Sequence, residues 1–211
     1  MSMEMAKKTR FTRMLIDANG FAAQRFHAWV FQPGMLFGSP DKWWGDFGQR
    51  DFPHEGLDFA LYQDEAGKIR SLDPGTRIPA MFAGVVRSLF SDYLGQAIVV
   101  EQADVEGEGH RRISIYAHTV PLTGVHPGII IDEGDVIATI ADTSRSKATI
   151  RPHLHFTLGQ LGGAVVYEQF VWNCMRDPHR VDLLDPLILL DWPHRIIASP
   201  VVSKAPWQTG E

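Results

Sequence analysis

The sequence predicts a mainly β protein with one principal domain. From Phe31 onward, short runs of β-branched and alternating residues follow one another, and clusters of Gly, Pro and charged residues separate them. The 211 residues suffice to bury one substantial core. No apolar stretch reaches the length of a membrane span. We therefore expect an antiparallel β-sandwich or open barrel with peripheral helical segments.

The strand pattern is clearest in four segments, which are residues 96–102, 111–118, 135–141 and 153–158. The first two should form a hairpin, because the intervening ADVEGEGH combines two glycines with charged residues and cannot be core. The pair Gly134 and Asp135 opens the third segment. Near the end of the chain, the apolar segment VDLLDPLILLD is broken by Pro186 and should close the domain.

Domain boundaries follow from the same pattern. We interpret residues 1–30 as an N-terminal extension, residues 31–195 as the domain and residues 196–211 as a loosely held tail. The N-terminus has basic residues without an apolar stretch behind them, so no signal peptide is visible. Five apolar side chains of the extension are expected to form one helical stripe: Phe11, Met14, Leu15, Phe21 and Phe26.

Charge and cysteine content exclude several classes of function. The 20 basic residues face 25 acidic ones, which gives a net charge of −5 and no bulk positive field for nucleic acid or an anionic membrane. The single cysteine, Cys174, excludes an internal disulfide and a multi-thiolate metal site. We expect it to be a small buried apolar residue rather than a reactive thiol. Nine histidines then stand out.

The first histidine motif is RPHLHFTL, in which His153, His155 and Thr157 alternate with apolar residues. On a strand, the two imidazoles would share one face with their Cα atoms about 7 Å apart. A metal ligand beside an acid–base group needs this arrangement. The alternative is a pair of solvent-facing histidines.

The second motif is ISIYAHT. Ile113, Ile115 and Ala117 alternate with the three residues Ser114, Tyr116 and His118. This alternation places His118 at the end of the polar face of its strand. A single histidine at a strand end is also compatible with an ordinary surface position.

The third motif is FPHEGLDFA, with His54 and Asp58 four residues apart. A helix is excluded, because Pro53 and Gly56 interrupt its first turn and Gly56 alone would cost about 1 kcal/mol. In a straight strand the two Cα atoms would be about 13 Å apart, too far for one ion. We therefore expect Gly56 to permit a bend or bulge that aims both side chains at one point. Glu55 is then expected to be solvated rather than catalytic.

The three motifs together predict a catalytic zinc site. Three nitrogen and oxygen ligands that leave a fourth position for water are typical of such a site. His54, Asp58 and one histidine of the HLH pair would bind the ion. The other histidine of that pair and His118 would remain as neutral groups that accept and return protons.

In their order along the chain, H-x-x-x-D, Y-A-H and H-L-H-F resemble the signature of the lysostaphin-type zinc endopeptidases, also called LytM-like or Gly-Gly endopeptidases. Many of these enzymes cut peptide cross-links in bacterial cell walls. The resemblance runs from His54 to about Leu158, roughly half of the chain. The segments PGTRIPAMFAGVV and EGDVIATIA between the motifs are also similar to the family, as is DPLILL near the end.

The resemblance implies a mostly antiparallel β fold with a substrate groove across one sheet. It implies a Zn²⁺-dependent endopeptidase that hydrolyses peptide bonds in peptidoglycan cross-links, located in the cell envelope, periplasm or outside the cell. The alternatives are a non-catalytic wall-binding or regulatory module and a zinc hydrolase of another peptide or amide. The implied roles are zinc ligation by His54, Asp58 and His155 and catalysis by His118 and His153.

The chain departs from this family at two places. The family usually has a Gly- and Ser/Thr-rich loop before H-L-H, where this chain has DTSRSKATIRP, and Thr157 replaces an acidic or amide residue. The cations of that loop are expected to be solvated, or else to contact a substrate carboxylate: Arg145, Lys147 and Arg151. Three aromatic residues before the third motif would line the groove or pack on the extension: Trp43, Trp44 and Phe47. Five histidines are expected to be structural or at the surface: His27, His110, His126, His179 and His194.

Overall fold

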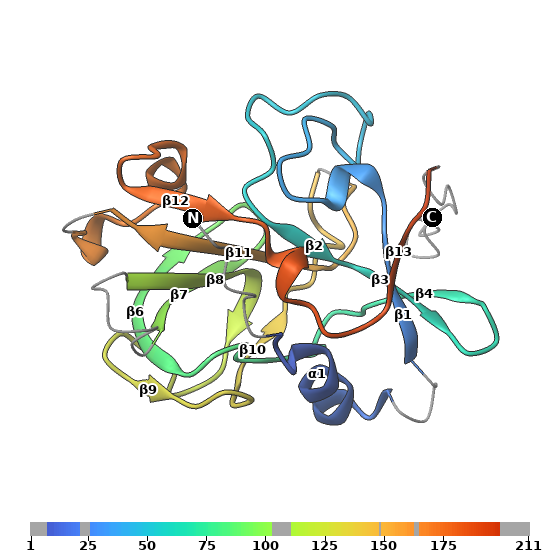
Figure 1. Cartoon of the computed structure of the whole chain (residues 1–211), viewed down its shortest axis with the longest axis horizontal. Coiled ribbons are helices and arrows are strands. Elements are labelled where there is room, and N and C mark those ends of the chain that lie inside the picture. The colour runs from blue at the N-terminus through green and yellow to red at the C-terminus, as the bar shows by residue number, and fades with distance from the viewer. Residues whose placement is uncertain (1–7, 22–25, 103–110, 148, 163–164, 199–211) are drawn as a thin grey trace.

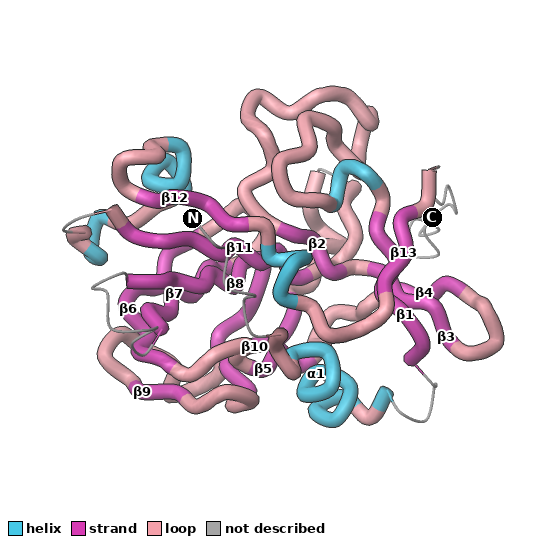
Figure 2. The backbone as a smooth tube through the Cα atoms, in the orientation of Figure 1, coloured by secondary structure: helices cyan, strands magenta, loops and turns pink. Residues whose placement is uncertain are grey.

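The computed structural model describes residues 8–21, 26–102, 111–147, 149–162 and 165–198. The expected mainly β fold is confirmed, and helical segments are few and peripheral (Figures 1 and 2). The segment ADVEGEGH, with His110, and nearly all of the expected C-terminal tail lie outside the described residues. The helical segments are α1 (Phe11–Asn19) and the 3-10 helices η2 (Pro33–Met35), η3 (Tyr167–Gln169), η4 (Trp172–Arg176) and η5 (Pro186–Leu189).

The described strands form two sheets. The larger sheet follows the order β12 (Val181–Leu184), β11 (Leu154–Leu161), β8 (Arg111–Pro121), β7 (Gln96–Gln102), β6 (Gly84–Ser91) and β9 (Ile130–Ile131). Three further strands join it, β10 (Val136–Ile140), β5 (Arg77–Pro79) and β2 (Leu57–Phe59). The smaller sheet has the order β13 (His194–Ile196), β1 (Phe26–Phe31), β3 (Leu61–Asp64) and β4 (Ile69–Ser71). Pairing is antiparallel except between β1 and β13, which run parallel.

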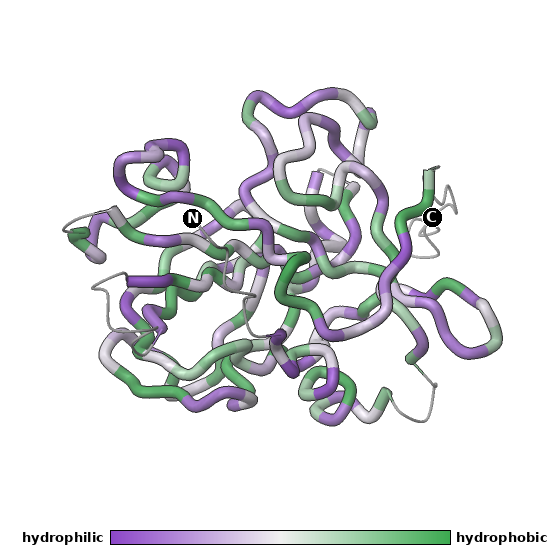
Figure 3. Tube along the Cα trace, in the orientation of Figure 1, coloured by the Kyte–Doolittle hydropathy of each residue, from purple (hydrophilic) through white to green (hydrophobic). Residues whose placement is uncertain are grey.

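The four strands expected from sequence are confirmed as β7, β8, β10 and β11, and β7 pairs with β8 as an antiparallel neighbour. The segment broken by Pro186 forms β12 and then η5. Apolar and polar stretches follow one another closely along much of the chain (Figure 3). This local alternation is why the strands could be located without the structure. Among the described residues, no helix combines the length and the apolar character needed to cross a membrane.

Two apolar clusters cover the two faces of the larger sheet. The main cluster includes Phe156 of β11 and also Phe11 and Leu15 of α1, which are fully buried. The helical stripe was wrong for two residues, because α1 ends at Asn19 and Phe26 begins strand β1. The smaller cluster is formed by β7, β8 and the segment after β11, and it includes Ile113, Ile115, Ala117, Phe170 and Met175.

Strand β11 organises the site. Along one edge it pairs with β8, and along the other it pairs first with β2 and then with β12. The first residues of β11 therefore lie between β2 and β8. Figure 1 shows β2 meeting β11 near the centre of the molecule. This position brings the second and third histidine motifs to the strand that carries the first.

Candidate metal centre

His54 and Asp58 reach one point because the chain is fixed just before β2. The backbone N–H of His54 donates to Ser39 O at 3.0 Å, and its carbonyl accepts from Gly38 N at 2.9 Å. Asp58 lies directly opposite His155 in the β2–β11 register. Residues that are directly paired point to the same face of a sheet, so the Asp58 carboxylate faces the His155 imidazole.

Gly56 is required by lack of space. A Cβ at this position would lie 2.4 Å from Phe156 O and 2.9 Å from Thr157 Oγ1. Gly56 is not among the glycines with positive φ. The expectation that glycine allows His54 and Asp58 to converge is consistent with this structure, but the reason is the close approach of the chain to β11.

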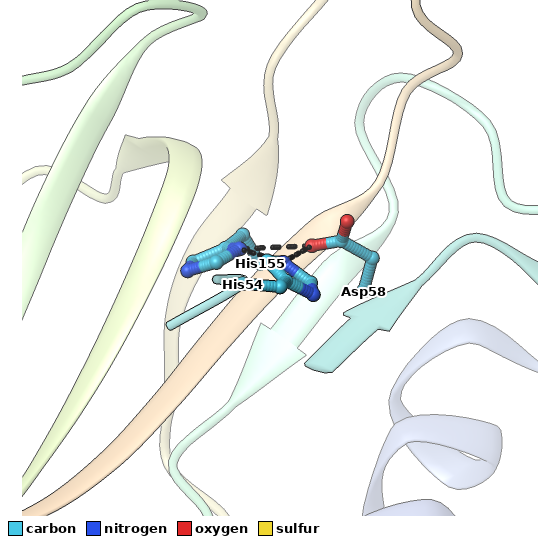
Figure 4. Close-up of side chains that lie close together, drawn as sticks. All are labelled: His54, Asp58 and His155. Carbon is cyan, nitrogen blue, oxygen red and sulfur yellow. Dashed lines mark hydrogen bonds and ion pairs between the residues drawn. The ribbon is translucent and has the colours of Figure 1, made fainter. Parts of the chain in front are cut away.

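Three ligand atoms converge at the site. His54 Nε2 lies 3.1 Å from Asp58 Oδ1 and 3.0 Å from His155 Nδ1, and these last two atoms are 2.8 Å apart. Figure 4 shows the three side chains pointing toward one another. A tetrahedral ion with bonds of about 2.0–2.1 Å separates its ligand atoms by about 3.3 Å. The donor set and its spacing therefore fit zinc after a small expansion.

Neighbouring groups select these ligand atoms. His54 Nδ1 donates to Leu36 O at 3.0 Å, which leaves the Nε2 lone pair free. His155 Nε2 lies 3.0 Å from Thr157 Oγ1, which leaves Nδ1 free when that hydroxyl accepts. Hydrogen bonds of this kind fix the tautomer and orientation of metal-binding histidines. Thr157 thus contributes directly to the site, although it departs from the family pattern.

The free oxygen of Asp58 is also held. Trp43 Nε1 donates to Asp58 Oδ2 at 2.7 Å, and Arg50 Nη2 lies 3.7 Å from the same atom. Burial by itself would raise the pKa of Asp58, but the His54, His153 and His155 imidazoles lower this pKa well below its usual range. The buried carboxylate is therefore ionised and ready to bind a cation.

His153 is buried immediately beside the ligands. Its Nδ1 donates to Arg151 O at 2.7 Å, and its Nε2 lies 3.7 Å from Asp58 Oδ1. The ring packs edge-on against Trp43, with centroids 5.1 Å apart. Burial lowers the pKa of His153 to about 3, so the ring is neutral. Its Nε2 lone pair therefore points toward the metal ligands.

His118 reaches the same place by a β-bulge. Two residues of β8, Ala117 and His118, oppose the single residue Ala97 of β7. His118 has a φ of 61°, and its ring centroid lies 4.7 Å from that of His153 and 5.6 Å from that of His155. Bulges re-aim side chains in this way.

Simple alternation along β8 was therefore the wrong reason for placing His118 at the site. Tyr116 pairs with Phe156, and its ring packs against Phe156 in the main core. A regular strand would point His118 to that same face, away from His155, which is opposite Ala117. The proposed polar face of Ser114 and Tyr116 is in fact fully buried.

An open cavity of about 250 Å³ adjoins these side chains. Its wall includes His118, His153 and His155, together with Trp44, Trp172 and Arg176. A second hollow of about 340 Å³ contains Asp142, Thr143, Ser146 and Lys147, and both hollows are lined by Tyr93 and Leu94.

Several wall residues could not be identified from the sequence. Tyr93 and Leu94 belong to the turn between β6 and β7, and Trp172 and Arg176 belong to η4. The His155 and Trp172 ring centroids are 5.3 Å apart. An aromatic residue in a turn was the only local signal for Tyr93, and η4 lies after the three motifs, where no pattern indicated a site.

Some of the other residues expected near the site lie there, and others do not. Trp43 and Trp44 belong to the site, whereas Phe47 is half exposed and does not line the cavity. Lys147 lines the second hollow, and Arg151 Nη1 donates to Ser71 Oγ at 3.0 Å. The histidines expected outside the site are exposed wherever they are described: His27, His126, His179 and His194.

Comparisons with known proteins define the class. Residues 53–166 match peptidase family M23, and this region includes all five histidine and aspartate residues of the site. The chain belongs to peptidase family M23. A comparison with curated proteins gave no match.

Three solved structures were found to be similar. A protein from Pseudomonas aeruginosa assigned to peptidase M23 is 26% identical, with 71% of this chain and 55% of that chain covered and a TM-score of 0.35. Lysostaphin is 21% identical, with 78% of this chain and 53% of lysostaphin covered and a TM-score of 0.42. A zinc-containing peptidase from Vibrio cholerae is 23% identical, with 64% of this chain and 36% of that chain covered and a TM-score of 0.39. The chain thus spans about half or less of the length of these three proteins, and the family assignment rests on the family match alone.

Proposed function

We propose that this chain is a zinc-dependent endopeptidase that hydrolyses peptide bonds in peptidoglycan cross-links. The observation that carries the proposal is the convergence of three ligand atoms within 3.1 Å beside two further imidazoles and an open cavity. Buried ligands with an accessible side are typical of a catalytic metal site rather than a structural one.

The proposed ligands are His54 Nε2, Asp58 Oδ1 and His155 Nδ1. Zinc bound by them would supply an activated water and a positive charge for the scissile carbonyl. Trp43, Arg50 and Thr157 do not bind the ion in this proposal. They hold the Asp58 carboxylate and the His155 ring in the orientation that ligation requires.

His153 and His118 are the proposed catalytic residues. His153 donates from Nδ1 to a backbone carbonyl, so its Nε2 is the nitrogen that accepts a proton from the attacking water. His118 lies closer to the open cavity, with its side chain 15% exposed. There it faces the reacting groups, where together with His153 it accepts the proton of the attacking water and returns it to the departing amine.

The proposed substrate is an extended peptide that lies across the site. The cavity and the second hollow share Tyr93 and Leu94, so a chain could continue from one to the other. Trp44 and Trp172 offer flat apolar walls, and the Arg176 guanidinium stacks over Phe52 at 3.8 Å. Together with the resemblance to wall-cutting endopeptidases, this groove favours a peptidoglycan peptide and a location in the bacterial envelope.

The test is a cleavage assay on purified cross-linked peptidoglycan fragments, with products identified by mass spectrometry. We expect one peptide bond to be cut, activity to disappear with a zinc chelator and to return when zinc is added. Binding of fragments without cleavage by the zinc-loaded chain would instead support a non-catalytic wall-binding module. Cleavage restricted to unrelated peptides or amides would refute the proposed substrate and leave the zinc hydrolase.

A further inference from the structure

Asp92 is a buried carboxylate that the proposed mechanism does not use. It lies in the turn between β6 and β7, and its side chain has no exposed surface. Its Oδ1 accepts hydrogen bonds from the backbone N–H groups of Leu94 and Gly95, at 2.8 and 2.6 Å. Its Oδ2 accepts from the backbone N–H of His118 at 2.6 Å. One carboxylate therefore joins the groove-lining turn to the bulge in β8.

The bulge is where His118 is re-aimed. A histidine with a φ of 61° lies in the left-handed region, which non-glycine residues rarely adopt. The hydrogen bond from its N–H to Asp92 is local to that strained residue and satisfies a backbone group that leaves the regular β7–β8 register. Asp92 therefore holds the conformation that brings the His118 ring to the side of His155.

The same oxygen also faces the His118 ring. Nδ1 of His118 is buried and lies 3.3 Å from Asp92 Oδ2, although the ring is not aligned for a hydrogen bond there. Among the described residues, Nδ1 has no hydrogen-bond partner. Burial alone would raise the pKa of Asp92, but the His118 side chain and backbone N–H groups lower it to about 2, so the carboxylate is charged. A charged acceptor beside Nδ1 favours a proton on that nitrogen.

We propose that Asp92 is a positioning residue for His118, which it orients through the bulge and through Nδ1 so that the Nε2 lone pair faces the substrate. This inference rests on the proposed function, because it assigns His118 its orientation in that reaction. Asp92 touches neither the metal ligands nor the cavity. Since Asp92 also holds the backbone N–H of Leu94, which lines the cavity, its effect on catalysis through His118 has to be separated from an effect through that turn.

A double-mutant cycle tests this dependence. Asp92→Asn retains one oxygen acceptor and removes the charge. We expect kcat to fall about 10- to 100-fold, KM to change less than about twofold and the zinc content to stay unchanged. In a His118→Ala background, adding Asp92→Asn should change kcat by less than about twofold, since the two residues act as one unit.

Asp64→Asn is the matched control. Asp64 is another buried carboxylate beside a turn, with Oδ1 accepting from the Lys68 N–H at 2.9 Å and Oδ2 paired with Arg70 at 2.7 Å. It lies in β3 of the smaller sheet and does not line the cavity. This variant should lose stability as Asp92→Asn does while keeping kcat within about twofold of wild type.

A second measurement examines the wild-type chain itself and uses a variant only to assign signals. The ¹⁵N chemical shifts of the imidazole rings report which ring nitrogen carries the proton. They are recorded on the zinc-loaded wild-type chain at one fixed pH, and the His118 signals are assigned as those missing in His118→Ala. We expect the Nδ1–H tautomer. The inference would be overturned by a proton on His118 Nε2. It would also be overturned if Asp92→Asn kept the wild-type kcat or lost zinc, or if Asp92→Asn lowered kcat further in the His118→Ala background. If the wild type cleaves no peptide, the proposed function fails, and the tautomer alone decides the role of Asp92.

Discussion

Substituting Gly56 by alanine perturbs the point at which β2 meets β11. The new Cβ would lie 2.4 Å from Phe156 O and 2.9 Å from Phe156 C. Both atoms belong to the backbone, so no side-chain rotation relieves the contact. Since Cβ atoms essentially never come closer than 3.0 Å, the two segments must separate by at least about 0.6 Å.

The size of the effect follows from this displacement. Overpacking of a well-packed interior costs about 1–3 kcal/mol of unfolding free energy, which corresponds to a fall in Tm of about 2–12 °C for a chain of this length. Asp58 follows two residues later and lies 2.8 Å from His155, so the separation also moves these ligands apart. Misplacement approaching 1 Å costs about 100-fold in rate, and we expect zinc affinity and kcat/KM to fall about 10- to 100-fold.

Zinc affinity is measured by competition with a chromophoric chelator, and the Tm of the metal-free chain is measured in parallel. Gly48→Ala is the matched control, because the three atoms nearest to its new Cβ all belong to the Asp46 carboxylate, which lies 3.2 Å away and can rotate. We expect this control to behave as wild type. Wild-type zinc affinity in Gly56→Ala, or an equal loss in Gly48→Ala, would refute the argument from close approach.

Three further predictions concern the site. Trp43→Phe removes the N–H that donates to Asp58 Oδ2, so zinc affinity should fall about 10- to 100-fold in chelator competition, whereas Trp44→Phe should leave it unchanged. His155→Ala should abolish zinc binding measured by atomic absorption, and full zinc occupancy in this variant would contradict the ligand assignment. His118→Ala and His153→Ala should keep the ion and retain only a small residual rate of cleavage. The pKa of Asp92 is lowered from 3.8 to about 2, so its contribution to stability is complete above about pH 4 and is lost as the pH falls toward 2. Denaturant titrations should show a loss of about 2 kcal/mol over this interval that Asp92→Asn does not show, and identical acid profiles would contradict it.

Much of the site could be predicted because its signals are local. The alternation in RPHLHFTL placed His153 and His155 on one strand face, and Pro53 and Gly56 excluded a helix around His54. These inferences depend on sterics within a few residues. The register that sets Asp58 opposite His155 could not be derived in the same way, since the paired residues are about a hundred positions apart in the chain.

The remaining features depend on contacts between distant segments. A bulge at His118 arises only when β7 and β8 pair, and the acceptor that holds it, Asp92, belongs to another turn. The first 30 residues include most of β1, in which Trp29 is fully buried and donates from its indole N–H to Thr12 of α1 at 2.9 Å. Mixed composition indicated an extension there, although this packing makes α1 and β1 part of the main core.

Thr157 shows which chemical property the site needs at the position where this chain departs from the family pattern. Its Oγ1 lies 3.0 Å from His155 Nε2 and has no exposed surface, so the ring nitrogen finds an acceptor without water. A threonine hydroxyl fixes the same tautomer as a carboxylate but adds no charge. Asp58 is then the one carboxylate in the candidate ligand set, and its charge is balanced nearby by Arg50. The orientation of His155 therefore requires an acceptor at position 157 rather than an anion, which explains how this chain can keep its ligand geometry with a residue that departs from the family pattern.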